Sequence, residues 1–255
     1  MAFLTIESKS KKSKIPAKLD LIQSITGVVL GLFIMAHIVA VSAILLGPNT
    51  AYWVDKALEG NFMDPAGHGF PGLVSLVAFV ILAILVVHAA LSLRKFPGSW
   101  QQFRIMQDQI ETLEHDETRL WLMQVITGFV LLFIGSAHVL SMMFNPTQID
   151  PFLAAERYLG QQMWVFYLIL LWAVVVHAFI GLYRAMLKWG VLSGEVRKAR
   201  RRLRVVRRIL TVLYLGVGTA SIVAYVQLGF SVDQPKGTRF TPTHQTYSIP
   251  TNHQQ

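Results

Sequence analysis

The sequence has no cysteine among its 255 residues. This absence excludes disulfides, cysteine-ligated zinc, iron–sulfur clusters held by this chain, and the Cys-x-x-Cys-His attachment of covalent haem. Charged residues are also scarce, at 15% of the chain against about 25% in a typical soluble domain. The length would permit one or two soluble domains, but this composition argues against them.

Long apolar runs occupy much of the chain instead. Hydrophobic residues make up 53% of it, and the mean hydropathy is +0.48. Five runs reach the ~20 residues that a helix needs to cross a bilayer. None of them contains Asp or Glu, and the sequence predicts an all-α membrane protein with five transmembrane helices. The runs are 21–46, 72–93, 120–143, 163–187 and 209–228.

The basic residues lie mostly beside these runs. The formal net charge is +9, and Lys and Arg gather in residues 1–20, directly after the second run, and in 194–208. These positions favour a membrane surface or a docked partner, and not nucleic acid, as the target. The positive-inside rule places all three segments in the cytoplasm. The predicted organisation is a cytoplasmic basic tail (1–20), a transmembrane domain (21–228) and a polar C-terminal tail on the outer side (229–255).

Four of the five runs carry one histidine each. An ionisable group inside a transmembrane segment is costly and is by default a functional hypothesis. The four are His37, His88, His138 and His177.

An internal repeat relates these runs to one another. The second and fourth runs share Val-Val-His-Ala around His88 and His177, each followed seven residues later by a cation. The first and third runs align without a gap. Their matching parts are Gln23-x-x-Thr26-Gly27 with His37, and Gln124-x-x-Thr127-Gly128 with His138.

Alternating helix directions put the histidines at two depths. His37 and His138 share a level near the outer side, and His88 and His177 share one near the cytoplasm. Two histidines that face each other across a helical bundle can hold one haem b by both axial positions. The pattern therefore predicts two haems stacked across the membrane. The alternatives are helix–helix hydrogen bonding, a zinc site, which needs its ligands in one tetrahedral cluster, and a proton relay, which would favour acids within the runs.

Further stretches complete a pattern across residues 15–230. They are Pro16-Ala17-Lys18-Leu19-Asp20, Gly31-Leu32-Phe33, Arg94-Lys95-Phe96-Pro97, and Gly181-Leu182-Tyr183-Arg184-x-x-x-Lys188-Trp189-Gly190. With these residues the chain resembles the di-haem cytochrome b membrane subunit of menaquinol:fumarate reductases and succinate:quinone oxidoreductases. The resemblance implies a four-helix bundle with two b haems, a fifth helix, and a place in the bacterial cytoplasmic membrane. It also implies an iron–sulfur subunit and an FAD-containing flavoprotein subunit as partners, menaquinone as substrate, and allows a dimer of the heterotrimer.

The resemblance also implies roles for individual residues. It assigns the inner haem to His88 and His177 and the outer haem to His37 and His138. It places four residues in contact with the propionates of the inner haem. Two of these residues have an ordinary alternative role: Trp121 as a tryptophan of the interfacial belt, and Lys188 as a positive-inside anchor. The four are Gln23, Ser24, Trp121 and Lys188. It implies no catalytic residue for dicarboxylate chemistry in this chain.

Two departures from the family pattern concern protons. Family members carry an acid on the fourth run, two positions before the haem ligand, that is assigned to a transmembrane proton route. This sequence has Val175 there. The acidic quinol-site residue of the first loop has no clean counterpart, and the candidates are Glu59, Asp64 and His68.

The predicted function is an electron-transferring membrane anchor that takes electrons from menaquinol and passes them through two haems to the iron–sulfur partner, and so to FAD and fumarate. The reverse direction, from succinate to quinone, uses the same parts. The haem b subunit of another respiratory dehydrogenase or hydrogenase is a neighbouring alternative. A cofactor-free transporter or structural anchor is the rival from a different class.

Overall fold

The computed structural model of the chain describes residues 14–65, 68–112, 116–190, 196–231 and 235–242. Residues 1–13 and 243–255, which belong to the two predicted tails, lie outside the described residues. In the described part every regular element is a helix. The α-helices are α1 (Ile15–Val41), α2 (Pro48–Leu58), α3 (Pro71–Leu93), α4 (Trp100–Thr112), α5 (Asp116–Val130), α6 (Ser136–Phe144), α7 (Pro151–Ala155), α8 (Trp164–Trp189) and α9 (Val196–Ser231). Short 3₁₀ or π turns join some of them: η1 (Ser42–Leu46), η2 (Asn61–Met63), η3 (Leu131–Gly135), η4 (Pro146–Gln148) and η5 (Glu156–Gly160).

Among the residues that the structure describes, five stretches are long and apolar enough to cross a membrane. The predicted all-α fold with five membrane-spanning helices is thus confirmed. The stretches are Ile15–Leu46, Pro71–Leu93, Glu117–Phe144, Trp164–Trp189 and Arg197–Ser231.

Two helices extend beyond the apolar runs that mark them in the sequence. The first begins at Ile15, with Pro16 in its first turn, where the missing proline N–H costs no helical hydrogen bond. The last begins at Val196 and includes the arginine-rich segment. From Val196 to Arg208 this helix contains neither glycine nor proline, and arginine is a good helix former, so the helix continues without a break.

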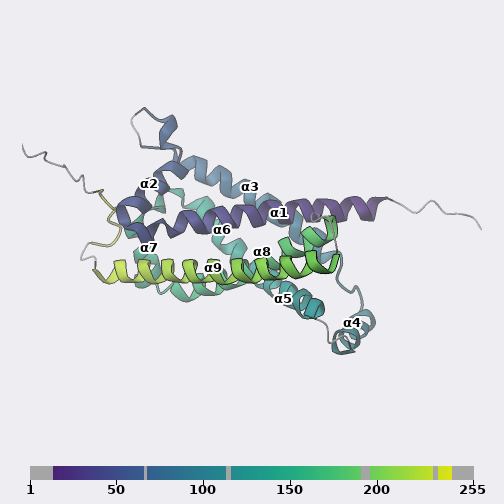
Figure 1. Ribbon diagram of the computed structural model, residues 1–255. Helices are drawn as coiled ribbons and strands as arrows, with labels where there is room; N and C mark the ends of the chain where they lie inside the picture. The colour runs from purple at the N-terminus through teal and green to yellow at the C-terminus, as the bar shows by residue number, and fades with distance from the viewer. Residues whose placement is uncertain (1–13, 66–67, 113–115, 191–195, 232–234, 243–255) are drawn as a thin grey trace, which may run out of the picture.

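The helices pack around α8. This helix contacts α1, α5 and α9, whereas α3 contacts α1 and α6. Figure 1 shows α1, α8 and α9 running along the length of the molecule, with α2 and α7 at one end and α4 near the other. The helices α1, α3, α8 and the α5–η3–α6 unit therefore form the bundle, and α9 lies along α8.

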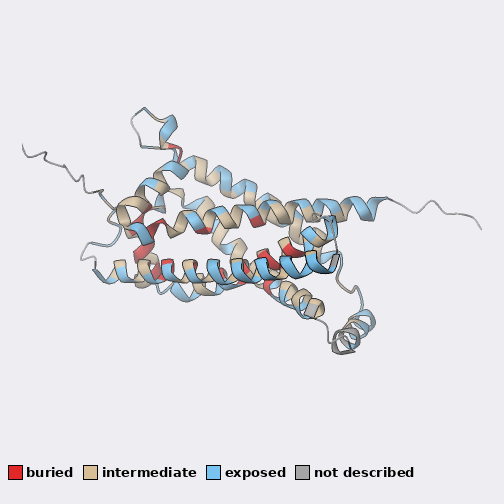
Figure 2. Ribbon diagram, in the orientation of Figure 1, coloured by how far each residue is buried: buried red, intermediate tan, exposed pale blue. Residues whose placement is uncertain are grey.

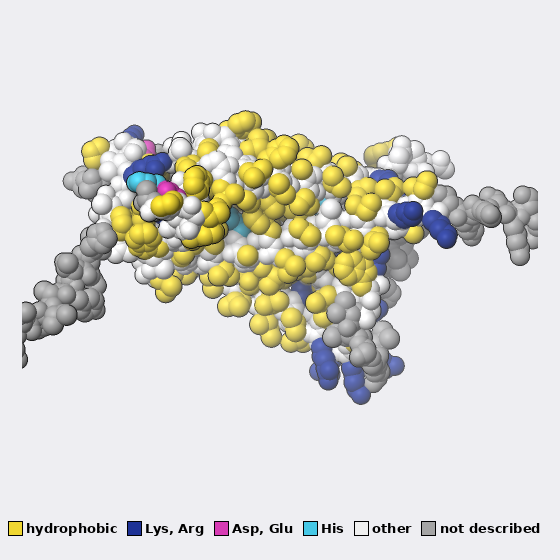
Figure 3. Space-filling model, turned by 90° about the horizontal axis from the view of Figure 1, so that it is seen from above, with side chains coloured by type: hydrophobic (Ala, Val, Ile, Leu, Met, Phe, Trp, Pro, Cys, Tyr) yellow, Lys and Arg dark blue, Asp and Glu magenta, His cyan; other side chains and the backbone are white. Residues whose placement is uncertain are grey.

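The apolar side chains are distributed as expected for a protein surrounded by lipid. Buried residues are few and lie between the helices (Figure 2), and Val175, Ile180 and Tyr183 on α8 are among the most enclosed. In contrast, α3 has no buried residue although it is almost wholly apolar. Hydrophobic side chains cover the middle of the surface, and Lys and Arg lie towards its ends (Figure 3). Such a belt is what a bilayer core would cover.

The two ends of the bundle differ in charge. At one, which we call the basic end, the carboxylate of Asp20 lies 2.9 Å from Arg94 and 3.0 Å from Lys95, and the Lys188 Nζ donates to the Asp20 carbonyl oxygen. The α2 and α7 helices lie at the opposite end (Figure 1), and η5 follows α7 directly in the chain.

The buried carboxylate of Asp150 organises the opposite end. Asp150 is 5% exposed and accepts hydrogen bonds from the N–H groups of Phe152 (2.8 Å) and Leu153 (3.2 Å), which caps α7. It also accepts from the N–H of Phe240 (3.0 Å), whose ring packs against Tyr52 of α2 and Phe152 of α7. The segment 235–242 is thereby held across this end.

The contact between α8 and α9 gives a test of the packing. Gly218 has no room for a side chain, because an added Cβ would lie 2.6 Å from Leu171 Cδ1. We expect Gly218→Leu to destabilise the protein by about 1–3 kcal/mol through overpacking, measured as a lower thermal unfolding temperature in detergent. Gly216→Leu is the matched control, because nothing lies within 4 Å of an added Cβ there. Equal effects of the two variants would show that α9 does not pack on α8 in this way.

Candidate functional site

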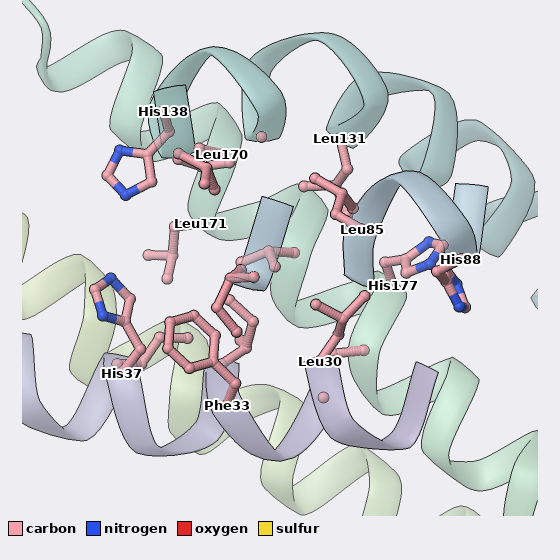
Figure 4. Close-up of a pocket in the computed structure, with 18 of the residues that line it drawn as sticks. Leu30, Phe33, His37, Leu85, His88, Leu131, His138, Leu170, Leu171 and His177 are labelled. Carbon is pink, nitrogen blue, oxygen red and sulfur yellow. The ribbon is translucent and has the colours of Figure 1, made fainter. Parts of the chain in front are cut away.

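The four intramembrane histidines meet as two pairs. His37 on α1 faces His138 on α6, with ring centroids 6.3 Å apart, and His88 on α3 faces His177 on α8, at 6.4 Å. Figure 4 shows the two pairs at different places along one cavity, with leucines and Phe33 between them. These are the pairs that the repeat and the depth argument predict.

The spacing within each pair fits one metal ion between two imidazoles. Metal–imidazole bonds of about 2.0–2.1 Å, plus about 1.1 Å from nitrogen to ring centre on each side, place trans ring centroids about 6.3 Å apart. The observed 6.3 and 6.4 Å match this value. In the described part of the chain no group of three or more His, Asp or Glu could hold a metal ion, so the geometry favours a two-histidine axial site over a zinc cluster.

The inner pair, His88 and His177, is oriented by the backbone. The Nδ1 atom of His88 lies 3.2 Å from the carbonyl oxygen of Gln23, and that of His177 lies 2.9 Å from the carbonyl oxygen of Gln124. A carbonyl can only accept, so in each ring Nδ1 carries the proton and donates. The Nε2 lone pair is then free to bind a metal, an arrangement by which proteins fix a ligand histidine.

The repeated Gln-x-x-Thr-Gly motif explains how this orientation arises. Thr26 Oγ1 lies 3.3 Å from His88 Nδ1, and Thr127 Oγ1 lies 3.3 Å from His177 Nδ1. Each threonine hydroxyl also donates to carbonyls of the preceding turn of its own helix, so its oxygen faces the imidazole as an acceptor. Each copy of the motif therefore holds the inner histidine of the neighbouring helix.

The glycine of each motif is required by contact with the ring. A Cβ at Gly27 would lie 2.8 Å from His88 Cε1, and one at Gly128 would lie 3.0 Å from His177 Cε1. Sequence reasoning identified the motif as a repeat but missed its role, since the contact is made between helices.

The outer pair, His37 and His138, is held by aromatic packing. The His37 ring stacks on Phe33 at 5.6 Å, and the edge of His138 meets Tyr167 at 5.7 Å. In the described part of the chain His138 Nδ1 is buried with no hydrogen-bond partner. The two pairs thus have different surroundings although they share a spacing.

One cavity of about 810 Å³ contains both pairs. It is within the range of about 300–1,000 Å³ that is usual for ligand and cofactor sites. Its wall includes all four residues predicted to contact propionates: Gln23, Ser24, Trp121 and Lys188. The Lys188 ammonium donates to Ser24 Oγ (3.1 Å), which brings two of them together at the basic end.

The predicted quinone residues lie away from the cavity wall. Glu59 is 2% exposed and its carboxylate is 2.6 Å from Lys56 Nζ. Asp64 accepts from the N–H groups of His68 and Gly69, and the His68 side chain is 83% exposed. None of the three is among the residues that line the cavity.

Sequence reasoning missed the two acids that do line the cavity, Asp55 and Asp150. Asp55 of α2 reaches the cavity together with Asp150, Arg157 and Tyr158. Burial raises the pKa of Asp55 to about 7, with further contributions from the negative charges of Asp150 and Glu59. No periodicity marks this residue, because its burial depends on η1, α1 and α7 packing against α2.

Comparisons with known proteins agree with this geometry. The chain is 38% identical over 231 residues to the fumarate reductase cytochrome b subunit of Wolinella succinogenes, covering 90% of each protein. It is 39% identical over 219 residues to the subunit of the same name from Helicobacter pylori, covering 86% of this chain and 84% of the relative. The chain belongs to the fumarate reductase cytochrome b subunit family. Residues 104–217 also match the family described as succinate dehydrogenase/fumarate reductase transmembrane subunit.

Membership of a cytochrome b family implies that the chain binds haem, and the cavity fits that cofactor. The four histidines in the cavity wall are the residues that would hold a haem iron. The fumarate reductase subunit family also implies that the chain works in an oxidoreductase complex with other subunits.

The contact between Gly27 and His88 predicts a spectroscopic change. We expect Gly27→Ala to displace the imidazole and so to shift the midpoint potential of one haem, or to lower its occupancy, in an optical redox titration. Gly135→Ala is the matched control in the same cavity wall, because its nearest neighbour would be at an ordinary 3.6 Å. If Gly27→Ala gave the titration curve of the control, the proposed contact with the ligand ring would be wrong.

Proposed function

We propose that this chain is the di-haem membrane anchor of a menaquinol:fumarate reductase. The proposal is based on two histidine pairs that lie at different levels of one cavity. In each pair the two rings are far enough apart for one metal ion to fit between them. When bound, the two haems supply one-electron carriers that connect a quinol on one side with the iron–sulfur partner on the other. The dicarboxylate chemistry then belongs to the flavoprotein partner with its FAD.

In this proposal each haem is held by a different pair of histidines. His88 and His177 hold the one nearer the basic end, through rings oriented by backbone carbonyls. His37 and His138 hold the other. The propionates of the first haem are anions, and the Lys188 ammonium with Ser24, Gln23 and Trp121 offers a cation and polar groups where they would lie.

The basic end faces the cytoplasm in this proposal. Positive-inside asymmetry assigns it there, and the long N-terminal part of α9 presents a helical row of arginines at that end. This surface is where we place the iron–sulfur subunit, with the flavoprotein beyond it. The C-terminus is then outside, and the membrane is the bacterial inner membrane.

The quinol site lies at the opposite end. The cavity extends there past the outer pair to Asp55, Asp150 and Tyr158. Of the three residues proposed from the sequence, Glu59, Asp64 and His68, Glu59 is the one that is buried, and it is one helical turn after Asp55. We retain it as part of the surroundings of the site.

The rival functions explain less. A transporter or a cofactor-free anchor accounts for the spans, but not for two histidine couples with metal spacing. Succinate oxidation uses the same parts in reverse, and the decisive experiment covers both directions. The purified complex should reduce fumarate with a water-soluble naphthoquinol as donor, and reduce the naphthoquinone with succinate. A complex active with a viologen dye but inert to quinones in both directions would contradict the proposal.

Loss of one ligand should remove one haem. We expect His177→Ala to leave about one haem per chain, because the His37–His138 couple is built from other helices. His37→Ala should leave the complementary haem, with a different midpoint potential. Haem per polypeptide and optical redox titration of both variants provide the measurement. If both variants kept the same haem, the pairing would be wrong.

A further prediction concerns membrane potential. Val175 is fully buried in the core cluster with Ile38 and Ile222, and α8 contains no Asp or Glu. Without a compensating proton path, protons released at the opposite end and consumed in the cytoplasm make electron transfer charge the membrane. Each charge crossing 100 mV changes the free energy by about 2.3 kcal/mol.

The complex in liposomes should therefore build up a potential during quinol oxidation, reported by a potential-sensitive dye. An ionophore that collapses the potential should change the rate. Turnover without any dye response would mean that protons cross by another path, or that the quinol site lies at the basic end.

A further inference from the structure

We propose that Arg184 is a positioning residue for the inner histidine pair, and that its charge makes the haem of that pair easier to reduce. This inference rests on the proposed function and deepens it, since it concerns how one of the two haem sites is tuned. The sequence carries a feature that the proposed function leaves unexplained. Each inner histidine, His88 and His177, is followed seven residues later by a cation, Lys95 or Arg184.

This spacing puts each histidine and its cation on one face of the same helix. Seven residues are about two turns of an α-helix, and they separate the two positions by about 10 Å along its axis. Between them on that face lies Gly181 in α8 and Ser92 in α3. The two helices pack on those that carry the repeated glutamines, α8 on α5 with Gln124 and α3 on α1 with Gln23. The two repeats therefore offer the same three positions to a glutamine of the neighbouring helix.

In the second repeat, α8 holds Gln124 at all three positions. His177 Nδ1 donates to the Gln124 carbonyl oxygen at 2.9 Å, and Arg184 Nη1 donates to the side-chain Oε1 at 3.0 Å. Gly181 leaves room for the amide, since a Cβ there would lie 3.0 Å from Gln124 Nε2. A guanidinium can only donate, so the amide oxygen has to face it. Arg184 thus fixes the residue whose carbonyl orients the His177 ring.

In the first repeat, α3 holds Gln23 with a neutral group. His88 Nδ1 lies 3.2 Å from the Gln23 carbonyl oxygen, and Gln23 Nε2 donates to Ser92 Oγ at 2.8 Å. The Ser92 hydroxyl donates to the His88 carbonyl oxygen, which leaves its own oxygen free to accept. The glutamine side chain is therefore a donor to α3 in this repeat, whereas Gln124 is an acceptor from α8.

The two repeated cations also differ in what balances their charge. Lys95 Nζ lies 3.0 Å from the carboxylate of Asp20. Among the described residues no carboxylate lies within 4 Å of the Arg184 guanidinium. Both cations line the cavity. Of the two, Arg184 is therefore the one that brings a charge without a paired carboxylate from the described part of the chain.

Such a charge favours the reduced state of a nearby haem, because ferric iron carries one positive charge more than ferrous iron. At an effective dielectric constant of about 20, a unit charge at about 10 Å changes the ratio of oxidised to reduced iron by about tenfold. Arg184 is exposed, and ions and water around it weaken the effect, so we expect about three- to tenfold. For a one-electron couple, at 59 mV per tenfold, this is about 30–60 mV.

The test is an optical redox titration of the purified complex, in which the inner haem is the one that His177→Ala removes. We expect Arg184→Gln to lower the midpoint potential of the inner haem by about 30–60 mV and to leave that of the outer haem unchanged. The new amide can still donate to Gln124, so this variant removes the charge and keeps a hydrogen-bond donor. Arg184→Lys retains the charge and should restore a potential close to that of the wild type.

A second variant neutralises the charge without removing Arg184. Gln124→Glu keeps the size of the side chain and its acceptor oxygen, and gives the guanidinium a carboxylate partner. It should lower the inner-haem potential in the same direction, and it decides the question if Arg184→Gln does not load the inner haem. Lys95→Gln is the matched control at the same position of the first repeat, and should shift the potential less, because Asp20 balances that charge.

The outcomes separate the two proposals. A wild-type complex with fewer than two haems per chain would overturn the proposed function. Two haems in the wild type, with an inner-haem potential that neither Arg184→Gln nor Gln124→Glu lowers, would overturn only the role of Arg184. An equal shift in Lys95→Gln would do the same, since it would show that any cation at this end has the effect.

Discussion

The structure depends on holding two imidazole rings about 6 Å apart inside an apolar bundle. Burying a polar ring without partners is costly, and this chain reduces the cost at the inner pair by directing each Nδ1–H to a backbone carbonyl of the next helix. Those carbonyls lie close to the rings only because Gly27 and Gly128 have no side chains. The absence of a side chain at these two glycines thus allows the close helix contact, the orientation of the rings and the free Nε2 lone pairs together.

The same constraint accounts for the internal repeat. A Gln-x-x-Thr-Gly turn on one helix and a histidine on the next make a unit, and two units face each other across the cavity. The outer pair, held by Phe33 and Tyr167, is built without this turn. If each pair holds a haem, as we propose, the different hydrogen bonding of the two pairs would give the two haems different potentials, since hydrogen bonds to a ligand histidine tune the metal.

Much of this arrangement could be predicted from the sequence. Apolar length predicts the five spans, and the matched depths of His37, His88, His138 and His177 predict which histidines pair. The role of Thr26 and Gly27 could not be predicted, because the repeat aligns them with His37 on their own helix while they contact His88 on another. Asp55 was missed for a related reason: it looks like a solvated loop acid until η1, α1 and α7 pack against α2, and only tertiary structure brings Asp150 and Arg157 near it.

The central claim is that each histidine couple is an axial haem site. It is tested most directly by counting haem in the purified wild-type chain and recording its reduced-minus-oxidised spectrum. The account predicts two haems b per polypeptide, both low-spin because both axial positions are filled by histidine, and two steps in a redox titration. A colourless protein, a single haem per chain or a high-spin spectrum would contradict it.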